Sequence, residues 1–380
     1  MKQSPQRIQF LDIMRGFAVI VMVMGHSIDS VLSVEVRSSD FFRMYDTMRG
    51  FTAPIFLFVS GFAYIVATEK RWDQLRSFGK PLVKRLLRIL LLFVIGYALH
   101  FPFLSFSKLA TGTTVEEYQQ FLQADVLHCV GASLLLLHIP LVFARTPRAF
   151  ALSVLGMTVG VATAAPLMWQ VDYSSTLGPV IAPYLNQKAL SIFPIFPYSA
   201  YLFSGVVVGH FSLAAGAVEK QKSYARTLVA GAAMLIACGL LFEFSPWTLY
   251  PPHDFWKASP NFFLIRIGVV MFVTVGFLYL RNLPPRVATQ LITLGKASLL
   301  VYTAHLIVVY GSAVNKGLAQ VLGKTLGYHE AIVAGLCVLC IMFALVHFWN
   351  YLRTHHQLPT KVVQFGLTST ILYFFFTQPY

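Results

Sequence analysis

Four ionisable side chains stand inside one long apolar run, residues 8–31: Asp12, Arg15, His26 and Asp29. Asp12 and Arg15 are three residues apart, as are His26 and Asp29, so in a helix each pair shares a face. Arg15 and His26 are eleven residues apart, which is close to three helical turns and about 16 Å of rise. A histidine beside a carboxylate is the usual arrangement of a general base. The simpler alternative is a neutralised Asp12–Arg15 pair and a hydrogen-bonded helix end at His26–Asp29.

A second group of charges opens the apolar run at 82–104, where Lys84, Arg85 and Arg88 follow one another within two helical turns. Two arginines three residues apart offer paired donors suited to a phosphate or diphosphate. The alternative is anchoring at the cytoplasmic boundary by long basic side chains, which explains Lys84 better than the deeper Arg88.

Other polar side chains at or inside apolar runs give weaker signals, because hydrogen bonding between helices explains them as well as chemistry does. Three of these signals are pairs three residues apart, and two are single residues. They are Asp46 with Arg49, Asp125 with His128, Tyr302 with His305, and the single residues Ser60 and Arg266.

The composition places all these residues in a membrane protein. Of the 380 residues, 57% are hydrophobic and 12% charged, about half the charged fraction of a soluble domain. The mean hydropathy is +0.67. These values exclude a soluble enzyme, a disordered chain and a nucleic-acid-binding protein, despite a net charge of +14. We therefore expect an all-α, polytopic helix bundle that forms a single membrane domain over residues 1–380.

A spanning helix needs about 20 apolar residues, and ten segments of the sequence meet this requirement approximately. The tail at 365–376 is apolar but short, which is more typical of a re-entrant or interfacial segment than of an eleventh span. With ten spans, more than half of the 29 Lys and Arg residues fall on one side. The positive-inside rule then places both termini in the cytoplasm of a cell-membrane protein. The segments are 8–31, 52–68, 82–104, 124–144, 149–168, 191–213, 228–244, 262–280, 288–314 and 331–351.

Several of these motifs resemble the transmembrane acyltransferase superfamily: the acyltransferase-3 proteins and, more closely, bacterial relatives of heparan-alpha-glucosaminide N-acetyltransferase. Members of acyltransferase-3 carry an Arg ten residues before a His, here Arg15 and His26, and an Arg-x-x-Arg, here Arg85 to Arg88. The Asn-rich outer loop of the eukaryotic lysosomal enzyme is absent, so the resemblance does not extend to a heparan acceptor. Stretches similar to the second branch are 53–61, 125–131, 193–198 and 294–305.

The resemblance implies transfer of an acyl group, typically acetyl, from cytoplasmic acyl-CoA to a hydroxyl or amine of an extracytoplasmic sugar or glycan. We expect the protein to be surrounded by membrane lipid, and a homodimer is compatible with this function. Neither a nucleic-acid partner nor a metal ion is expected. The implied catalytic residues are His26, Asp29, Arg15, Asp12, His305 and Tyr302. Those for the acyl-CoA are Arg85, Arg88, Lys84 and Ser60, and those for the acceptor are Asp46, Arg49, Asp125, His128 and Arg266.

Two other functions remain open on the sequence. A transporter or flippase of a polar small molecule or lipid-linked sugar would share the charges inside spans. It would also show inverted repeats and broken helices, and the sequence shows neither clearly. A scaffold or receptor would leave Arg15, His26, Arg85 and Arg88 without an explanation, although charges inside spans are unfavourable.

The orientation gives the first testable prediction. The loop at 172–188 lies outside if both termini are cytoplasmic. Single cysteines placed in this loop, in a variant without the four native cysteines, should react with an impermeant thiol reagent added to intact cells. Reaction only after the reagent reaches the cytoplasm would reverse the orientation of every span.

Overall fold

The computed structural model describes residues 9–214, 221–247, 249–280, 283–355 and 357–378. Within them the chain is almost entirely helical, which confirms the predicted fold class, and one short hairpin is the exception. Parts of the predicted topology fall outside the described residues. These are Ile8, with which the first predicted span begins, and the cations Lys2, Arg7, Lys220 and Arg281 of the orientation argument.

The chain divides into two compact units, and each is described by itself. Unit 1 comprises Met1–Met14, Gly50–Gly96 and Gln123–Ala288, and unit 2 comprises Arg15–Arg49, Tyr97–Leu122 and Thr289–Tyr380. Three helices have residues in both: α1 (Gln9–Val31), α6 (Lys80–Leu99) and α17 (Pro285–Lys296).

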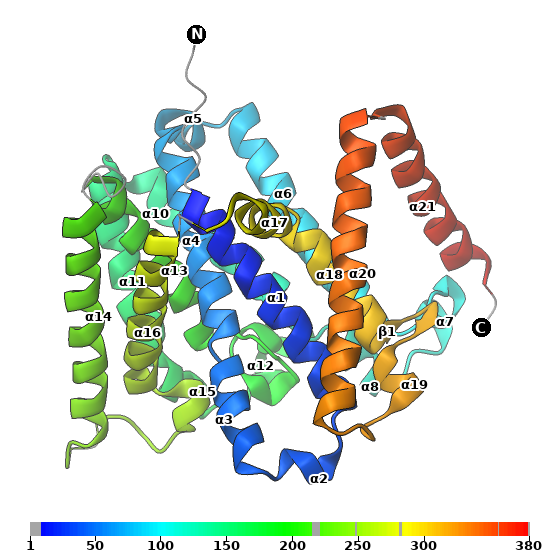
Figure 1. The fold of residues 1–380 in the computed structure, drawn as a ribbon, viewed down its shortest axis with the longest axis horizontal. Helices are drawn as coiled ribbons and strands as arrows, with labels where there is room; N and C mark the ends of the chain where they lie inside the picture. The colour runs from blue at the N-terminus through cyan, green and yellow to red at the C-terminus, as the bar shows by residue number, and fades with distance from the viewer. Residues whose placement is uncertain (1–8, 215–220, 248, 281–282, 356, 379–380) are drawn as a thin grey trace. The chain divides into compact units, whose positions relative to one another are not determined.

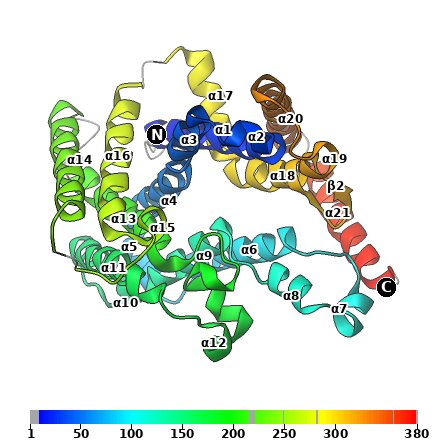
Figure 2. The same ribbon diagram turned by 90° about the horizontal axis from the view of Figure 1, so that it is seen from below.

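The long helices of unit 1 pack in pairs, α4 with α13, α11 with α13, and α14 with α16 (Figures 1 and 2). Short helices and turns connect them. The elements are α4 (Thr52–Glu69), α5 (Trp72–Arg76), α9 (Val126–Leu136), α10 (His138–Phe143), α11 (Pro147–Met168), α12 (Ser174–Ile181), η1 (Ala182–Tyr184), η2 (Gln187–Ala189), α13 (Ile195–Ala214), α14 (Gln221–Glu243), α15 (Phe255–Ala258) and α16 (Pro260–Tyr279).

Unit 2 is built around the part of α1 that follows Met14, which shares a buried cluster with α17, α18 and α20. The end of α1 is tied to the segment before α20, because Ser33 N donates to Leu326 O and Leu326 N donates to Val31 O. The elements are α2 (Val34–Arg37), α3 (Asp40–Arg49), α7 (Phe106–Thr111), α8 (Val115–Phe121), α18 (Ser298–Tyr310), β1 (Gly311–Ser312), β2 (Asn315–Lys316), α19 (Leu318–Leu322), α20 (Tyr328–His355) and α21 (Gln357–Thr377).

Among the residues that the structure describes, seven helical segments are long and apolar enough to cross a membrane, or eight if a bent pair counts as one span. The protein is therefore a multi-pass membrane protein. Two further predicted spans, 82–104 and 191–213, correspond to α6 and α13, but α6 carries four basic residues and α13 is interrupted at Phe196. The predicted total of ten spans and the orientation stay predictions.

The predicted span at 288–314 is not one straight helix. The structure has two helices there, α17 and α18, bent by 77° at the junction. The physical reason lies in α17, whose Arg286, Gln290 and Lys296 leave apolar residues on only part of its circumference. Such an amphipathic helix favours the membrane interface over the hydrocarbon core.

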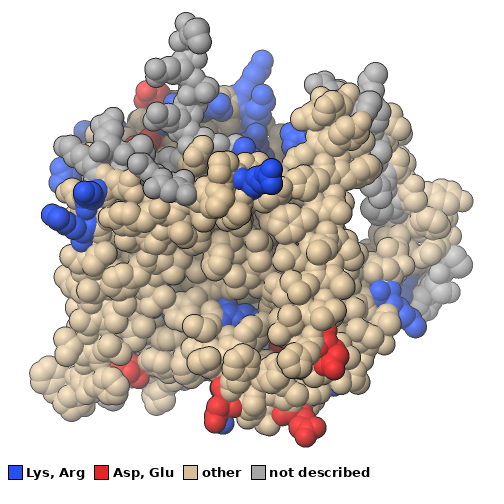
Figure 3. Space-filling model, in the orientation of Figure 1, with Lys and Arg blue, Asp and Glu red and all other residues tan. Residues whose placement is uncertain are grey.

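Charge is distributed unevenly within each unit. In unit 1, Lys and Arg side chains gather around α5 and the beginning of α6 (Figure 3). In unit 2, Asp and Glu side chains lie over α2 and α3. The basic residues at the start of α6 belong to the predicted cytoplasmic side.

The closest helix pair of unit 1 depends on two glycines. A Cβ at Gly61 would overlap the carbonyl oxygen of Leu202, and one at Gly205 would overlap the carbonyl oxygen of Phe58. Small residues of this kind let two spanning helices approach at backbone distance. This contact fixes α4 against α13.

Replacing Gly205 with Ala is expected to lower the free energy of unfolding by about 1–3 kcal/mol, because the backbones of α4 and α13 must move apart. Gly156→Ala on α11 is the matched control, since nothing lies within 4 Å of a Cβ there. Thermal unfolding of the two purified variants measures the difference. Equal midpoints would show that residue 205 tolerates a side chain and that the close contact is not required.

Candidate active site

Two histidines far apart in the sequence meet inside unit 2. His26 Nδ1 on α1 lies 3.0 Å from His305 Nε2 on α18, and the two rings stack with centroids 5.2 Å apart. His305 is fully buried, whereas His26 is half-buried. The sequence predicted each residue as a site candidate but gave no sign that they pair.

Helical spacing explains why these two side chains meet. On α1 two buried valines lie four residues apart, and His26 comes three residues after the second of them. On α18 a buried valine lies four residues before His305 and another lies four residues after it. Residues with this spacing share one face, so the valines that pack in the core of unit 2 bring the histidines together. The residues are Val19, Val23 and His26 on α1, and Val301, His305 and Val309 on α18.

The hydrogen bonds define which ring nitrogen carries each proton. His305 Nδ1 lies 2.8 Å from the carbonyl oxygen of Val301, which can only accept, so this nitrogen carries the hydrogen. In the neutral ring His305 Nε2 is then an acceptor, and His26 Nδ1–H donates to it. His26 Nε2 is left with its lone pair. The pair therefore presents one base of defined position.

Asp29, expected to orient His26, is held by two arginines. Its Oδ1 accepts from Arg37 Nη1 at 2.8 Å, and its Oδ2 lies 3.4 Å from Arg49 Nη1. Arg37 also donates to the backbone carbonyl of Asp29 and, at 3.1 Å, to that of Leu32. The structure thus gives His26 a histidine partner where the sequence predicted a carboxylate. Charge-assisted bonds to two guanidinium groups favour this placement of Asp29.

The predicted pair of Asp46 and Arg49 is present, with Arg49 Nη2 at 2.5 Å from Asp46 Oδ1. Arg49 passes across α1 at Gly25, where a Cβ would come within 3.0 Å of its Cδ. Because Gly25 precedes His26, the guanidinium of Arg49 belongs to the surroundings of the histidine pair. Arg37, Asp29, Arg49 and Asp46 thus form one network in which cations and carboxylates alternate.

Sequence reasoning missed Arg37 and Tyr310. Arg37 lies just beyond the end of α1, where a basic side chain can bond the last carbonyls of a helix, and this signal could have identified it. Tyr310 ends α18, and its ring centroid lies 5.9 Å from that of His26. Gly311, with φ of 84°, stops the helix directly after Tyr310.

In unit 1 the basic side chains of α6 differ in their surroundings. Arg85 is half-buried and donates from Nη1 to Thr68 Oγ1 on α4 at 2.9 Å. Arg88 is exposed and shares its helix face with Lys84 and Lys80, at intervals of four residues. The two arginines therefore differ in surroundings, which the sequence did not predict.

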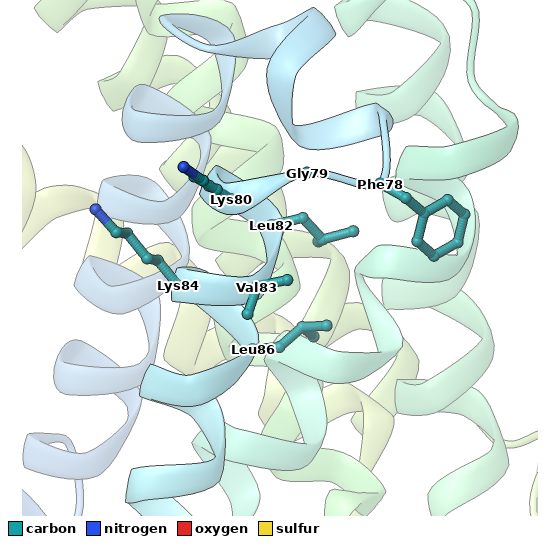
Figure 4. Close-up of a pocket in the computed structure, with 7 residues that line it drawn as sticks. All are labelled: Phe78, Gly79, Lys80, Leu82, Val83, Lys84 and Leu86. Carbon is teal, nitrogen blue, oxygen red and sulfur yellow. The ribbon is translucent and has the colours of Figure 1, made fainter.

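Lys80 and Lys84 also line a surface hollow of about 520 Å³ in unit 1. Figure 4 shows both ammonium groups extending to one side of α6, with Leu82, Leu86 and Phe78 on the other side. The apolar side chains therefore line the hollow, and the two ammonium groups extend away from them.

The remaining predicted pair, Asp125 and His128, begins α9. Asp125 Oδ1 accepts from the backbone N–H groups of Leu127 and His128 and lies 2.7 Å from His128 Nδ1. Both side chains are buried. This is a helix cap, a sufficient structural reason for the pair.

The other predicted residues have separate settings. Ser60 donates its hydroxyl to Phe56 O of its own helix at 2.8 Å. Arg266 lies over the ring of Phe262 at 4.2 Å. The Tyr302 ring centroid lies 5.7 Å from that of His305. On α1, Asp12 is buried and Arg15 half-buried.

Comparison with known proteins adds one finding. Residues 7–242, well over half of the chain, match the family model described as heparan-alpha-glucosaminide N-acetyltransferase, catalytic. No curated protein matches the chain. The matched range contains His26, Asp29, Arg37 and Arg85.

Replacing Arg37 with Gln is expected to lower the free energy of unfolding by roughly 1–3 kcal/mol, because Asp29 and two carbonyl oxygens lose their donors. Arg43→Gln is the matched control. Arg43 also pairs with an aspartate, Asp40 at 2.6 Å, but these side chains are 72% and 95% exposed. A surface pair of this kind contributes little. Similar unfolding midpoints for both variants would show that Arg37 does not stabilise the end of α1.

Proposed function

Because the chain belongs to the family of the heparan-alpha-glucosaminide N-acetyltransferase catalytic domain, we propose that it is an acetyl-CoA-dependent acetyltransferase of the membrane. It transfers acetyl from cytoplasmic acetyl-CoA to an amine or hydroxyl of an extracytoplasmic acceptor, a sugar or glycan. The observation that carries the proposal is the His26–His305 pair, which joins α1, a candidate membrane span, to the fully buried His305 on α18. Residues 1–380 act as one acyltransferase domain with cytoplasmic termini.

The proposed chemistry starts at His26 Nε2. This nitrogen takes the proton of the acceptor while the acceptor nitrogen or oxygen attacks the thioester carbonyl carbon. The C–S bond then breaks, and the departing CoA sulfur receives the proton from His26. Alternatively, Nε2 attacks the thioester carbonyl carbon, the C–S bond breaks and CoA leaves as the thiolate, which forms a short-lived acetyl-imidazolium. The acceptor then takes the acetyl group from Nε2, and its proton passes to the CoA thiolate. In both cases the hydrogen bond from His26 Nδ1 to His305 holds the ring and stabilises its positive charge.

The surroundings of the other residues near His26 suggest two further roles. His305 uses both ring nitrogens for Val301 and His26, so the adjacent Tyr302 is the proposed donor to the developing oxyanion. The network of Asp29, Arg37, Arg49 and Asp46 beside His26 is proposed to bind the acceptor.

Acetyl-CoA carries negatively charged phosphate groups, which positively charged side chains can bind. Arg85, Arg88 and Lys84 are proposed to bind the phosphates of CoA, since charge-assisted bonds to arginine are suited to phosphate. Arg15, one of the polar residues of α1, is proposed to lie along the pantetheine arm, with Asp12 three residues before it. Arg266 remains a proposed acceptor residue. Ser60 remains a proposed residue for CoA and Asp125 and His128 for the acceptor, although each also makes a local hydrogen bond.

One observation favours a transporter as the second candidate. The 77° break between α17 and α18 resembles the discontinuous helices that transporters use for binding. His305 lies on α18, so a transported polar molecule would meet the same histidines. Release of CoA separates the two functions, because transport alone does not cleave a thioester.

His26→Ala is expected to reduce acetyl transfer by a factor of about 10² to 10⁴, because the general base is lost. The assay follows acetyl-CoA cleavage by purified protein with amino-sugar and hydroxyl acceptors. His347→Ala is the control: His347 is exposed on α20 and bonds Gln290. CoA binding should persist in both variants.

Two results would contradict the proposal at different levels. If the wild type neither binds CoA nor cleaves acetyl-CoA with any acceptor, the acetyltransferase function is wrong. If His26→Ala retains the activity of the wild type, the function stands and the assignment of the base is wrong.

A further inference from the structure

Arg85 is held by a short chain of hydrogen bonds within unit 1. Thr68 Oγ1 donates its single hydrogen to the backbone carbonyl of Tyr64 at 2.6 Å. The oxygen can therefore only accept from Arg85 Nη1, which lies at 2.9 Å. Thr68 is fully buried, so the geometry of this acceptor is fixed by α4 itself.

The ring of Tyr64 supports the same guanidinium from a second direction. Arg85 Cζ lies 4.5 Å from the ring centroid, within the range of a cation–π contact. Tyr64 is 8% exposed and packs against Phe150 and His138. One acceptor and one aromatic face thus hold Arg85 in a single position.

The charge around Arg85 is unbalanced. Among the described residues, no carboxylate forms an ion pair with Arg85, and Glu69, which follows Thr68 in the chain, accepts a hydrogen bond from His210 at 2.5 Å. Arg88, three residues later on α6, adds a second positive charge to the same helix. Gathering cations without an anion is unfavourable in a partly buried setting. An anionic ligand would balance this positive charge.

We propose that Tyr64 and Thr68 are positioning residues that hold Arg85 as a ligand of a phosphate group of acetyl-CoA. The inference rests on the proposed function and extends it to two residues of α4. Thr68 accepts from one of the five N–H donors of the guanidinium, which leaves donors for phosphate oxygens. A phospholipid headgroup offers the same chemistry, so the test must separate the two sources.

The test measures equilibrium binding to purified protein in nanodiscs of uncharged lipid. The probes are CoA, dephospho-CoA, which lacks the 3′-phosphate, and pantetheine, which has no phosphate. Thr68→Val removes the acceptor at nearly constant shape and is expected to weaken CoA binding about tenfold. Pantetheine binding should not change. In turnover, KM for acetyl-CoA should rise by the same factor at unchanged kcat.

Matched variants separate positioning from general damage. Thr158→Val is the control, because Thr158 is also buried and also donates to the carbonyl four residues earlier, at 2.9 Å, but contacts no cation. Thr68→Ser and Tyr64→Phe retain the acceptor and the ring, so both should bind CoA like the wild type. Tyr64→Leu removes the ring and should weaken binding about threefold or more.

Four outcomes would overturn the inference. Unchanged CoA affinity in Thr68→Val, with CoA bound by the wild type, would leave the proposed function intact and remove the role of Thr68. An equal loss for CoA and pantetheine would show a structural effect. If Thr68→Val alters only the binding of anionic phospholipid, measured in nanodiscs containing it, the phosphate is that of a lipid. Absence of CoA binding by the wild type would reject the proposed function as well.

Discussion

A polar side chain inside a lipid bilayer has no water to hydrogen-bond, so its partners must come from the protein or from a ligand. Several polar groups of the described helices satisfy this constraint locally. Thr68, Thr158 and Ser60 donate to carbonyl oxygens of their own helices. Asp29 is held between Arg37 and Arg49. Polar groups that keep an unused acceptor or an unbalanced charge after these contacts are therefore the best candidates for binding a ligand.

Two such groups stand out, one in each unit. The hydrogen-bond chain from His26 through His305 to Val301 ends in a backbone carbonyl and leaves His26 Nε2 with a lone pair. The contacts of Arg85 with Thr68 and Tyr64 leave its charge without a carboxylate among the described residues. One group is a base and the other a cation, which are the two kinds of group that acetyl transfer from CoA requires.

Close helix packing supplies the rigidity that both groups need. In unit 1, Gly61 and Gly205 bring the backbones of α4 and α13 together, and α4 carries Tyr64 and Thr68 in its following turns. In unit 2, the buried valines of α1 and α18 fix the separation at which two imidazole rings can share a hydrogen. Apolar packing thereby sets the geometry of the polar contacts.

The sequence by itself determined the membrane class and the pairs three residues apart, Asp46 with Arg49 and Asp125 with His128, because both depend on local composition and helical periodicity. Only the tertiary structure decided that His26 meets His305, that Asp29 turns to Arg37, and that Arg85 and Arg88 point in different directions. It also decided the bend between α17 and α18. The physical reason is that the apolar faces of different helices have nearly the same spacing of apolar residues in the sequence. Which faces pack, and so which distant polar groups meet, depends on the shapes of the side chains along the whole contact.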